Sequence, residues 1–337
     1  MFQTDINHFL QRYSSDWLDA FMIGVSWTGG QTFLVGVLCL IVLGVDLKRG
    51  FLLLQMFLIT VIATDVFKTV FELPRPFFVD DTLMSFGALK EGMSALVGGA
   101  AQSFMAWPPE QSIEAFRAHD WTPGEYGLPS GHVTSAVALW GGMALVFRKK
   151  RIGLFAILMI VLMVISRLYL ARHFLADILA GLGLSFFILL ISAILLNRMN
   201  WQKLFLPGSY SLSEDRGAIG LFFAGFILPV AVLLSGEGHS GRIVALLAVN
   251  LALIGLVGIE ISFEAGKYWQ RALRVVLGIG LYVVLNELVK IIPMDQSGPI
   301  YPLIKGFVPV FILFFAAPLL VSFTMRERVV NLTPSQH

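Results

Sequence analysis

Long apolar runs constrain the fold of this chain more than any other feature of its sequence. Hydrophobic residues make up 57% of the 337 residues and charged residues only 14%, against roughly 25% charged residues in a soluble domain. Because a helix needs about 20 apolar residues to cross the hydrocarbon of a bilayer, we predict an all-α, polytopic membrane protein with about nine transmembrane helices. The predicted spans are Gln31–Val45, Phe51–Phe71, Val133–Phe147, Ile152–Ile165, Phe174–Leu196, Gly217–Leu234, Ile243–Phe263, Leu273–Ile291 and Val308–Phe323.

The N-terminal segment is apolar at Trp17–Trp27, but Gly29 and Gly30 end this run before it reaches the length of a comfortable span. We interpret residues 1–30 as an interfacial segment whose tryptophans lie at the headgroup level; a tenth, short span is the alternative. The first charge is Asp5, and no small-residue cleavage site follows an apolar core. We therefore expect no cleavable signal peptide.

A histidine and an aspartate stand four residues apart at the edge of an apolar run, as His173 and Asp177. If Phe174 opens a helix, both side chains lie on one face, so the carboxylate can hold one imidazole nitrogen and leave the other free and basic. An imidazole oriented in this way is a nucleophile or a base. Arg167 precedes the pair, although arginine, histidine and aspartate also gather at membrane interfaces for solubility.

Two upstream motifs add cations and the start of a helix. Lys68 lies at the end of an apolar run, whereas Arg75 stands between two prolines that stop any helix and preset the backbone. Further along, Ser130, Gly131 and His132 directly precede another apolar run. There a hydroxyl and unpaired backbone N–H groups meet the positive end of a helix dipole, which is a ready site for a phosphate oxygen.

Taken in order, Lys-x6-Arg-Pro, Pro-Ser-Gly-His and Ser-Arg-x5-His-x3-Asp resemble the motifs of the type 2 phosphatidic acid phosphatase (PAP2) superfamily, which also contains vanadium haloperoxidases and bacterial acid phosphatases. The resemblance covers about residues 60–195, and no charged position of the motifs is missing. It implies a phosphohistidine mechanism in which His173 attacks phosphorus, Asp177 orients His173, and His132 protonates the leaving oxygen. The residues implied to neutralise the phosphoryl oxygens are Lys68, Arg75, Ser130, the Gly131 N–H and Arg167.

Phosphoryl transfer needs mainly in-line positioning and stabilisation of charge on three equatorial oxygens, and three cations plus a helix start supply both. We therefore expect no cofactor and no metal, since the sequence has no His-Glu-x-x-His, no clustered aspartate pair and no Cys/His spacing of a metal site. The expected partners are the lipid bilayer and a membrane lipid phosphate, with no nucleic acid; a homodimer stays open. The candidate substrates are phosphatidate, phosphatidylglycerol phosphate, a prenyl diphosphate and a sphingoid phosphate.

Hydrolysis of a lipid phosphate or diphosphate is thus the predicted function. A lipid phosphotransferase using the same phosphohistidine is the nearest alternative, because the phosphoryl group could pass to another lipid instead of water. A transporter or flippase would also explain many spans and intramembrane charges, but it would not require the histidine, aspartate and helix start on one face.

Clusters of lysine and arginine fall in alternate connections between the spans, and the positive-inside rule makes those connections cytoplasmic. All three motifs then lie together on the outer face. Because the loops are short, we expect a bacterial inner membrane protein with its active site facing the periplasm. The cationic clusters are Lys48-Arg49, Arg148–Arg151, Arg198 with Lys203, Lys267 with Arg271 and Arg274, and Arg326 with Arg328.

The chain divides by composition into an interfacial segment (1–30), a catalytic membrane domain (31–200), a connector (201–216) and an accessory transmembrane bundle (217–337). The catalytic domain contains an unusually long outer-face loop, 77–128, which suggests a function.

Within that loop, the apolar middle Met84–Trp107 is expected to form a lid beside the lipid entrance, or a surface helix that covers the core. His119 and Asp120 are placed at a solvated turn. In the accessory bundle, Glu287 and Lys290 lie one turn apart and are expected to pair inside the bundle; a role in binding the substrate headgroup or in a dimer contact is the alternative.

Overall fold

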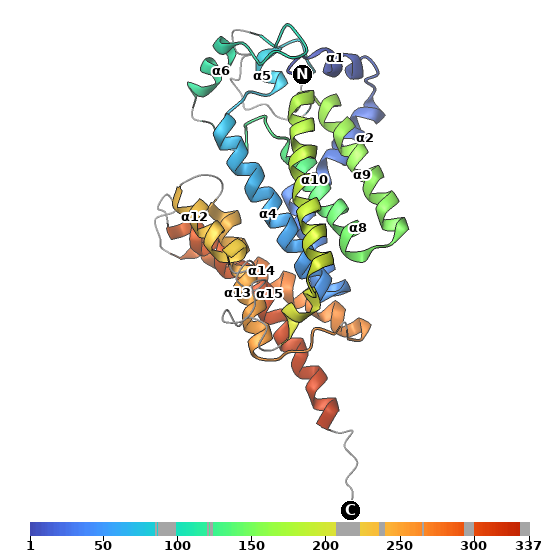
Figure 1. Ribbon diagram of the computed structural model, residues 1–337, viewed down its shortest axis with the longest axis vertical. Helices are drawn as coiled ribbons and strands as arrows, with labels where there is room; N and C mark the ends of the chain where they lie inside the picture. Colours follow the sequence, from blue (N-terminus) through green and yellow to red (C-terminus); the bar gives the residue numbers. More distant parts are fainter. Residues whose placement is uncertain are drawn as a thin grey trace, which may run out of the picture. The chain divides into compact units, whose positions relative to one another are not determined.

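The computed structural model of this chain describes residues 1–84, 86, 99–119, 121, 124–206, 223–235, 240–264, 266–292 and 300–330. Every secondary-structure element in these ranges is a helix, which confirms the predicted all-α class (Figure 1). The helices are α1 (Asp5–Gln11), α2 (Asp16–Trp27), α3 (Gln31–Cys39), η1 (Leu40–Val45), α4 (Leu47–Phe71), α5 (Pro76–Val79), α6 (Glu110–Arg117), α7 (Gly131–Ala136), η2 (Val137–Gly141), α8 (Gly142–Phe147), α9 (Lys150–Tyr169), α10 (Leu175–Arg198), η3 (Trp201–Phe205), η4 (Phe223–Ile227), α12 (Leu228–Ser235), α13 (Ser240–Gly258), α14 (Tyr268–Ile291) and α15 (Ile300–Val330).

The chain folds into two compact units that interleave along the sequence. The first unit comprises Met1–Leu34 and Ile59–Ala193, and the second comprises Val35–Leu58 and Ile194–His337. The first unit therefore takes in the N-terminal segment, which composition set apart from the catalytic domain. The connector predicted at 201–216 lies outside the described residues from position 207 onward, and the domain functions stay predictions.

Fewer helices in the described residues meet the criteria of a membrane span than the nine spans predicted. Within the described residues, six helices are long and apolar enough to cross a membrane, and the pair Asp16–Trp27 and Gln31–Val45, bent by 53°, makes a seventh if it counts as one span. Two further apolar helices, Gly131–Phe147 and Gly225–Ser235, are shorter. Nine spans are thus not confirmed, whereas the apolar helices identify a membrane protein. The six are Leu47–Val79, Lys150–Tyr169, Leu175–Arg198, Ser240–Gly258, Tyr268–Ile291 and Leu303–Phe323.

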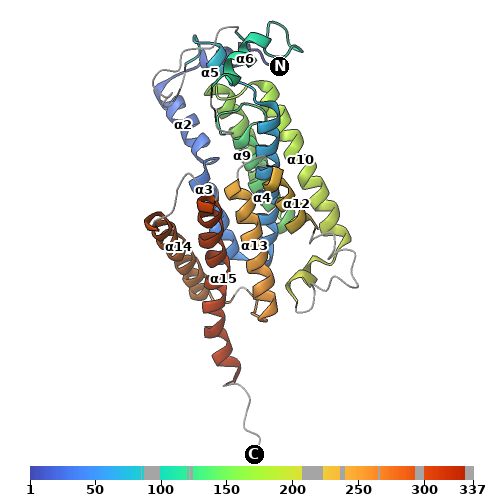
Figure 2. The same cartoon turned by 90° about the vertical axis from the view of Figure 1, so that its left-hand side faces the viewer.

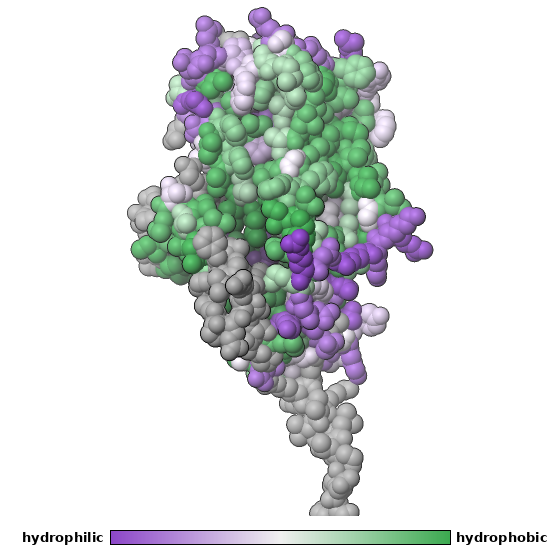
Figure 3. Space-filling view, in the orientation of Figure 1, coloured by the Kyte–Doolittle hydropathy of each residue, from purple (hydrophilic) through white to green (hydrophobic). Residues whose placement is uncertain are grey.

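In the first unit, α9 is the helix around which the others pack. It contacts α1, α2 and the run formed by α7, η2 and α8. Large apolar side chains on α9 and α10 remain exposed, among them Leu154, Ile157, Phe187 and Leu190. Figure 3 shows this hydrophobic surface on the first unit, with hydrophilic side chains beyond its ends. An apolar surface of this extent suits contact with lipid tails.

The outer-face loop predicted at 77–128 is partly helical, because it contains α5 and α6. Figures 1 and 2 place both helices at the end of the first unit that also holds the N-terminus. Phe78, Phe116 and Phe174 belong to one buried cluster beneath these helices. Residues 85 and 87–98, in the segment predicted as a lid, lie outside the described residues, and so does Asp120, whereas His119 is exposed as predicted.

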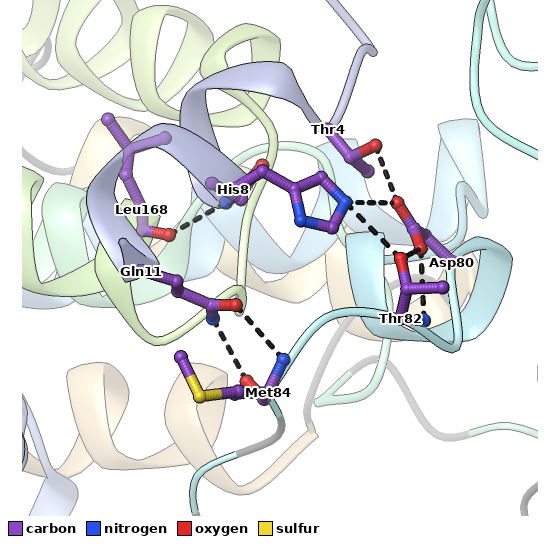
Figure 4. Close-up of polar contacts among 8 residues, drawn as sticks. Thr4, His8, Gln11, Asp80, Thr82, Met84 and Leu168 are labelled. Carbon is purple, nitrogen blue, oxygen red and sulfur yellow. Dashed lines mark hydrogen bonds and ion pairs between the residues drawn. The ribbon is translucent and has the colours of Figure 1, made fainter. Parts of the chain in front are cut away.

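Helix α1 is tied to the chain that follows α5 by the carboxylate of Asp80 (Figure 4). Thr4 Oγ1 donates a hydrogen bond to Asp80 Oδ2 at 2.7 Å, and His8 Nε2 lies 2.9 Å from the same oxygen. Burial alone would raise the pKa of Asp80, but hydrogen bonds from Thr82, Thr4 and His8 lower it to about 2. The charged carboxylate therefore holds the N-terminus on the first unit at neutral pH.

The second unit is a bundle in which α13 and α14 both pack on α15, and η1 packs on α14 and α15. Gln55 Nε2 donates to Asn250 Oδ1 at 2.5 Å, and Asn250 Nδ2 donates to the Gly225 carbonyl at 2.6 Å. The predicted pair of Glu287 and Lys290 is present, with 2.6 Å between Oε1 and Nζ, but both side chains are exposed, so the pair does not lie inside the bundle as predicted. The contacts of the buried Asn250, by contrast, link elements of the unit.

Candidate active site

The turn between α9 and α10 holds His173, and Asp177 lies in the first turn of α10. Ala171 has a φ of 53°, in the left-handed region, and this residue turns the chain after the end of α9. His173 is 1% exposed, and its Nδ1 lies 3.1 Å from Asp177 Oδ2. The N–H of Phe174 donates to the same oxygen at 3.0 Å. With its proton on Nδ1, His173 donates to Asp177 and keeps Nε2 for chemistry.

The electrostatics of this turn favour the neutral imidazole. Burial lowers the pKa of His173 well below its ordinary value, and the positive charges of Arg75, Arg167 and Lys68 lower it further. The neutral form is the one with a free electron pair on nitrogen. Cations of the first and third motifs therefore act on one buried histidine.

The second motif lies against the start of α10. The Ser130 N–H donates to the Asp177 carbonyl at 3.0 Å, and the Thr134 N–H donates to the Ser130 carbonyl as α7 begins. A Cβ atom at Gly181 would come within 3.2 Å of the Ser130 carbonyl oxygen, so glycine permits this close approach of helix and turn.

The first motif meets the second through its lysine. Lys68 Nζ donates to the Tyr126 carbonyl, and Arg75 Nη2 donates to the Gly124 carbonyl. A Cβ atom placed on Gly131 would lie 3.7 Å from Lys68 Cε, which brings the end of α4 next to the start of α7. The structure thus gathers all three motifs at one end of the first unit.

Gly127 is a residue of this site that the sequence analysis did not identify. Its N–H donates to the Leu73 carbonyl at 2.7 Å. A Cβ atom at this position would stand 2.7 Å from the Pro74 carbonyl oxygen and 3.2 Å from Asp177 Oδ2. Only glycine lets the chain pass between the first motif and the carboxylate that holds the histidine. Its position two residues before Pro129 was the only sequence signal.

A pocket of about 310 Å³ opens on this constellation, at the lower end of the volumes typical of ligand sites. Of the predicted site residues, Arg75, His132 and Arg167 line it. His173, Asp177, Lys68, Ser130 and Gly131 are not among its lining residues. The other lining residues are Ile23, Ser26, Trp27, Phe86, Leu170 and Arg172.

Several buried polar atoms of the predicted site have no hydrogen-bond partner in the part of the chain that the structure describes. They are Ser130 Oγ, Arg75 Nε, Arg167 Nε and Asp177 Oδ1. Buried polar groups are nearly always hydrogen-bonded. An anion with several oxygens, bound beside Arg75 and Arg167, would satisfy the two guanidinium donors and the hydroxyl together.

The N-terminal helices complete the site, although no motif lies in them. Ser26 Oγ accepts a hydrogen bond from Arg167 Nη1 at 2.6 Å, and Ser166 Oγ donates to the Met22 carbonyl at 2.7 Å. A Cβ atom at Gly29 would lie 2.8 Å from His132 Cδ2, so the break between α2 and α3 packs on the histidine ring.

Helix α1 supports the backbone of the catalytic turn. Asn7 Nδ2 donates to the Leu168 carbonyl at 2.7 Å and to the His173 carbonyl at 3.3 Å. Gln11 Nε2 donates to the Tyr169 carbonyl at 3.0 Å. These side-chain amides bind carbonyls in the last turn of α9 and in the turn that follows it. In the sequence, the only indication that α1 binds this backbone was the presence of polar residues in the N-terminal segment.

Comparison with known proteins identifies the family of this constellation. Residues 49–201 match the model of the PAP2 superfamily, a segment that carries all three motifs and ends before most of the second unit. No curated protein matches the chain, and no solved structure matches it either.

Proposed function

Since this chain belongs to the PAP2 superfamily through residues 49–201, a family of phosphatases and phosphotransferases of lipid phosphates, we propose that it is a metal-independent lipid phosphate or diphosphate phosphatase that acts through a phosphohistidine. The observation that carries the proposal is the buried pair of His173 and Asp177 next to a pocket lined by Arg75, Arg167 and His132. This combination supplies a nucleophile, its orienting carboxylate, cations and an acid.

In the proposed reaction, His173 Nε2 forms a bond to phosphorus while the bond from phosphorus to the leaving oxygen breaks. His132 donates a proton to that oxygen. Lys68, Arg75 and Arg167 stabilise the charge on the equatorial oxygens. Water then attacks phosphorus and gives a proton to His132 as the phosphorus–nitrogen bond breaks, so that the lipid alcohol or monophosphate and inorganic phosphate are the products and both histidines are restored.

The ends of two helices support an outward-facing site. α9 begins within the cationic connection Arg148–Arg151 and ends at the turn that carries His173, about 30 Å away for a helix of 20 residues. The helical run from Gly131 to Phe147 joins the second motif to the same connection. With that connection cytoplasmic, the site faces outward, which is the periplasm in a bacterial inner membrane.

The direct test is phosphate release by the purified full-length protein from phosphatidate, phosphatidylglycerol phosphate, a prenyl diphosphate and a sphingoid phosphate, with and without EDTA. We expect release from at least one lipid, equal activity in EDTA, and an acid-labile, alkali-stable phosphoryl label on His173. Loss of activity in EDTA, or a labelled residue other than histidine, would contradict the mechanism.

Water and a second lipid compete for the phosphohistidine, so the same assay separates hydrolase from phosphotransferase. Addition of a diacylglycerol acceptor should leave the yield of inorganic phosphate unchanged if water is the acceptor. A labelled lipid phosphate formed at the expense of inorganic phosphate would favour the transferase.

Sidedness can be tested in sealed vesicles with the protein inserted outer face outward. Lipid phosphate confined to the inner leaflet should be spared until a scramblase is added. Immediate hydrolysis of the inner-leaflet lipid would contradict the proposed orientation.

A further inference from the structure

The active-site pocket contains one more arginine than the phosphatase motifs require. Arg75 and Arg167 belong to the motifs, whereas Arg172 lines the same pocket and has no role in them. No carboxylate is among the lining residues. One transferred phosphoryl group already faces Arg75, Arg167 and the buried Lys68, so the charge of Arg172 is available to a second anionic group.

The guanidinium group of Arg172 is held in place by its surroundings. Nη2 donates to the Phe86 carbonyl, and the guanidinium carbon lies 5.2 Å from the centre of the Phe77 ring. The backbone N–H of Arg172 donates to the Arg167 carbonyl at 3.1 Å, which fixes the two arginines relative to each other. A guanidinium group has five N–H donors, and the Phe86 carbonyl takes one of them. The remaining donors are suited to phosphate oxygens.

We propose that Arg172 binds the second phosphate of a lipid diphosphate, the one that leaves with the lipid, so that the preferred substrate class is a lipid diphosphate. This inference rests on the proposed function. The pocket lining between Arg172 and α2 is apolar at Ile23, Trp27 and Leu170, which suits the first carbons of a lipid chain next to its diphosphate.

The reaction balances with water as the only co-reactant. His173 Nε2 bonds to the terminal phosphorus, and the bond from that phosphorus to the bridging oxygen breaks with its electron pair staying on the oxygen. The charge that develops on that oxygen lies next to Arg172, and His132 protonates the oxygen as the lipid monophosphate leaves. Water then releases inorganic phosphate from His173. An arginine beside the leaving phosphate stabilises the charge that develops there, so it should act on the diphosphate and not on a monophosphate of the same lipid.

The test compares farnesyl diphosphate with farnesyl monophosphate, which share one tail, in detergent micelles with the full-length protein. We expect the wild type to prefer the diphosphate in kcat/KM. Arg172→Gln should lower the ratio of the two kcat/KM values by at least about tenfold, because a charge-assisted hydrogen bond to phosphate is lost. The matched control is Arg12→Gln, at an exposed arginine that follows α1, and it should keep the wild-type ratio.

Equal proportional losses on both substrates in Arg172→Gln, or a wild type without preference for the diphosphate, would overturn the subsite. If Arg172→Gln does not yield monodisperse protein, Arg172→Lys serves, and an intermediate ratio is expected because charge without the planar fork remains.

Binding separates this inference from the proposed function. A farnesyl methylenediphosphonate, which cannot be hydrolysed at its bridge, should bind the wild type at least about tenfold more tightly than a farnesyl phosphonate, and Arg172→Gln should remove the difference. This result without turnover of any lipid would retain the subsite and reject the phosphatase. Turnover of a lipid together with equal binding of both analogues would retain the phosphatase and reject the subsite.

Discussion

The two compact units differ in what they bury. Every predicted site residue belongs to the first unit, which buries charged side chains such as Lys68, Arg167 and Asp177. In the described part of the second unit, the buried polar side chains are Asn250, Gln270, Arg274 and Ser322. Because burying a charge is costly, charged groups inside a membrane protein mark function. Among the described residues, the first unit holds most of the buried charges and the second holds one, Arg274. This difference supports the proposal that the chemistry resides in the first unit.

The N-terminal segment sharpens this comparison, because it belongs to the first unit without carrying a motif. Ser26 contacts Arg167, and Asn7 contacts the carbonyl of His173. The segment also lies outside the residues matched by the family model. Membership in the catalytic unit is thus a matter of contacts with the site and not of motif content.

The largest effect expected is that of His173→Ala, since no other group can form the covalent intermediate. We predict a loss of kcat of roughly 10⁴-fold or more, as for other residues of covalent catalysis. Phosphate release at equal folded protein is the measurement. The control is His119→Ala, at an exposed histidine of the same unit, which should retain wild-type activity. Substantial turnover by His173→Ala would show that another residue is the nucleophile.

Arg167→Lys should have the next largest effect. Lysine keeps the charge but lacks the fork that binds two oxygens, so we predict a loss of about 10²-fold in kcat/KM, as for removal of one donor to a transition-state oxyanion. The affinity for vanadate should fall as well. The same substitution at Arg198, which is exposed at the end of α10, should change neither quantity. Full vanadate affinity in Arg167→Lys would refute its assignment to the anion site.

Ser26→Ala tests whether the N-terminal segment positions a catalytic cation. The variant removes the acceptor of the Arg167 Nη1 hydrogen bond, and we predict about a tenfold loss of kcat/KM together with weaker vanadate binding. Ser26→Thr retains a hydroxyl and should recover most of both. In the control, Ser192→Ala, the lost hydrogen bond is only one to the Ile188 carbonyl of the same helix. If Ser26→Ala were as active as the wild type, α2 would contribute to packing only.

The second unit should respond in stability more than in catalysis. A Cβ atom at Gly278 of α14 would lie 2.5 Å from Leu43 Cδ1 and 2.9 Å from Leu313 Cδ1, whereas nothing lies within 4 Å of one at Gly280. We predict that Gly278→Val destabilises the protein by about 2 kcal/mol, from overpacking, and Gly280→Val by clearly less. Thermal unfolding in detergent measures this. A selective loss of kcat in folded Gly278→Val would break the contrast between the units.

The smallest effect concerns the attachment of α1 at low pH. With its pKa lowered to about 2, Asp80 contributes stability that is present above its ordinary pKa and is lost as pH falls through the folded-state value. We predict a contribution of about 1 kcal/mol, seen as a drop in melting temperature between pH 4 and pH 2 that Asp80→Asn lacks. Asp81→Asn, at the exposed neighbour, should keep the drop, and a parallel decline in both variants would contradict the prediction.

The sequence by itself predicted the membrane class and the family to which the three motifs belong. Apolar run length sets the capacity to span a bilayer, because that requirement depends only on helix rise and hydrocarbon thickness. The spacing of His173 and Asp177 likewise predicted their contact, since four residues bring two side chains onto one face. Such local relations depend on only a few neighbouring residues, so they can be predicted without knowledge of the fold.

Only the tertiary structure decided which distant segments complete the site. Gly127 belongs to the site because its backbone passes between Pro74 and Asp177. Ser26 belongs to it because it accepts a hydrogen bond from Arg167, 141 positions away. The bend between α2 and α3, which brings Gly29 onto His132, also follows from packing. A glycine or serine in an apolar run has no local pattern that reveals its partner, because its role arises from how closely two helices approach.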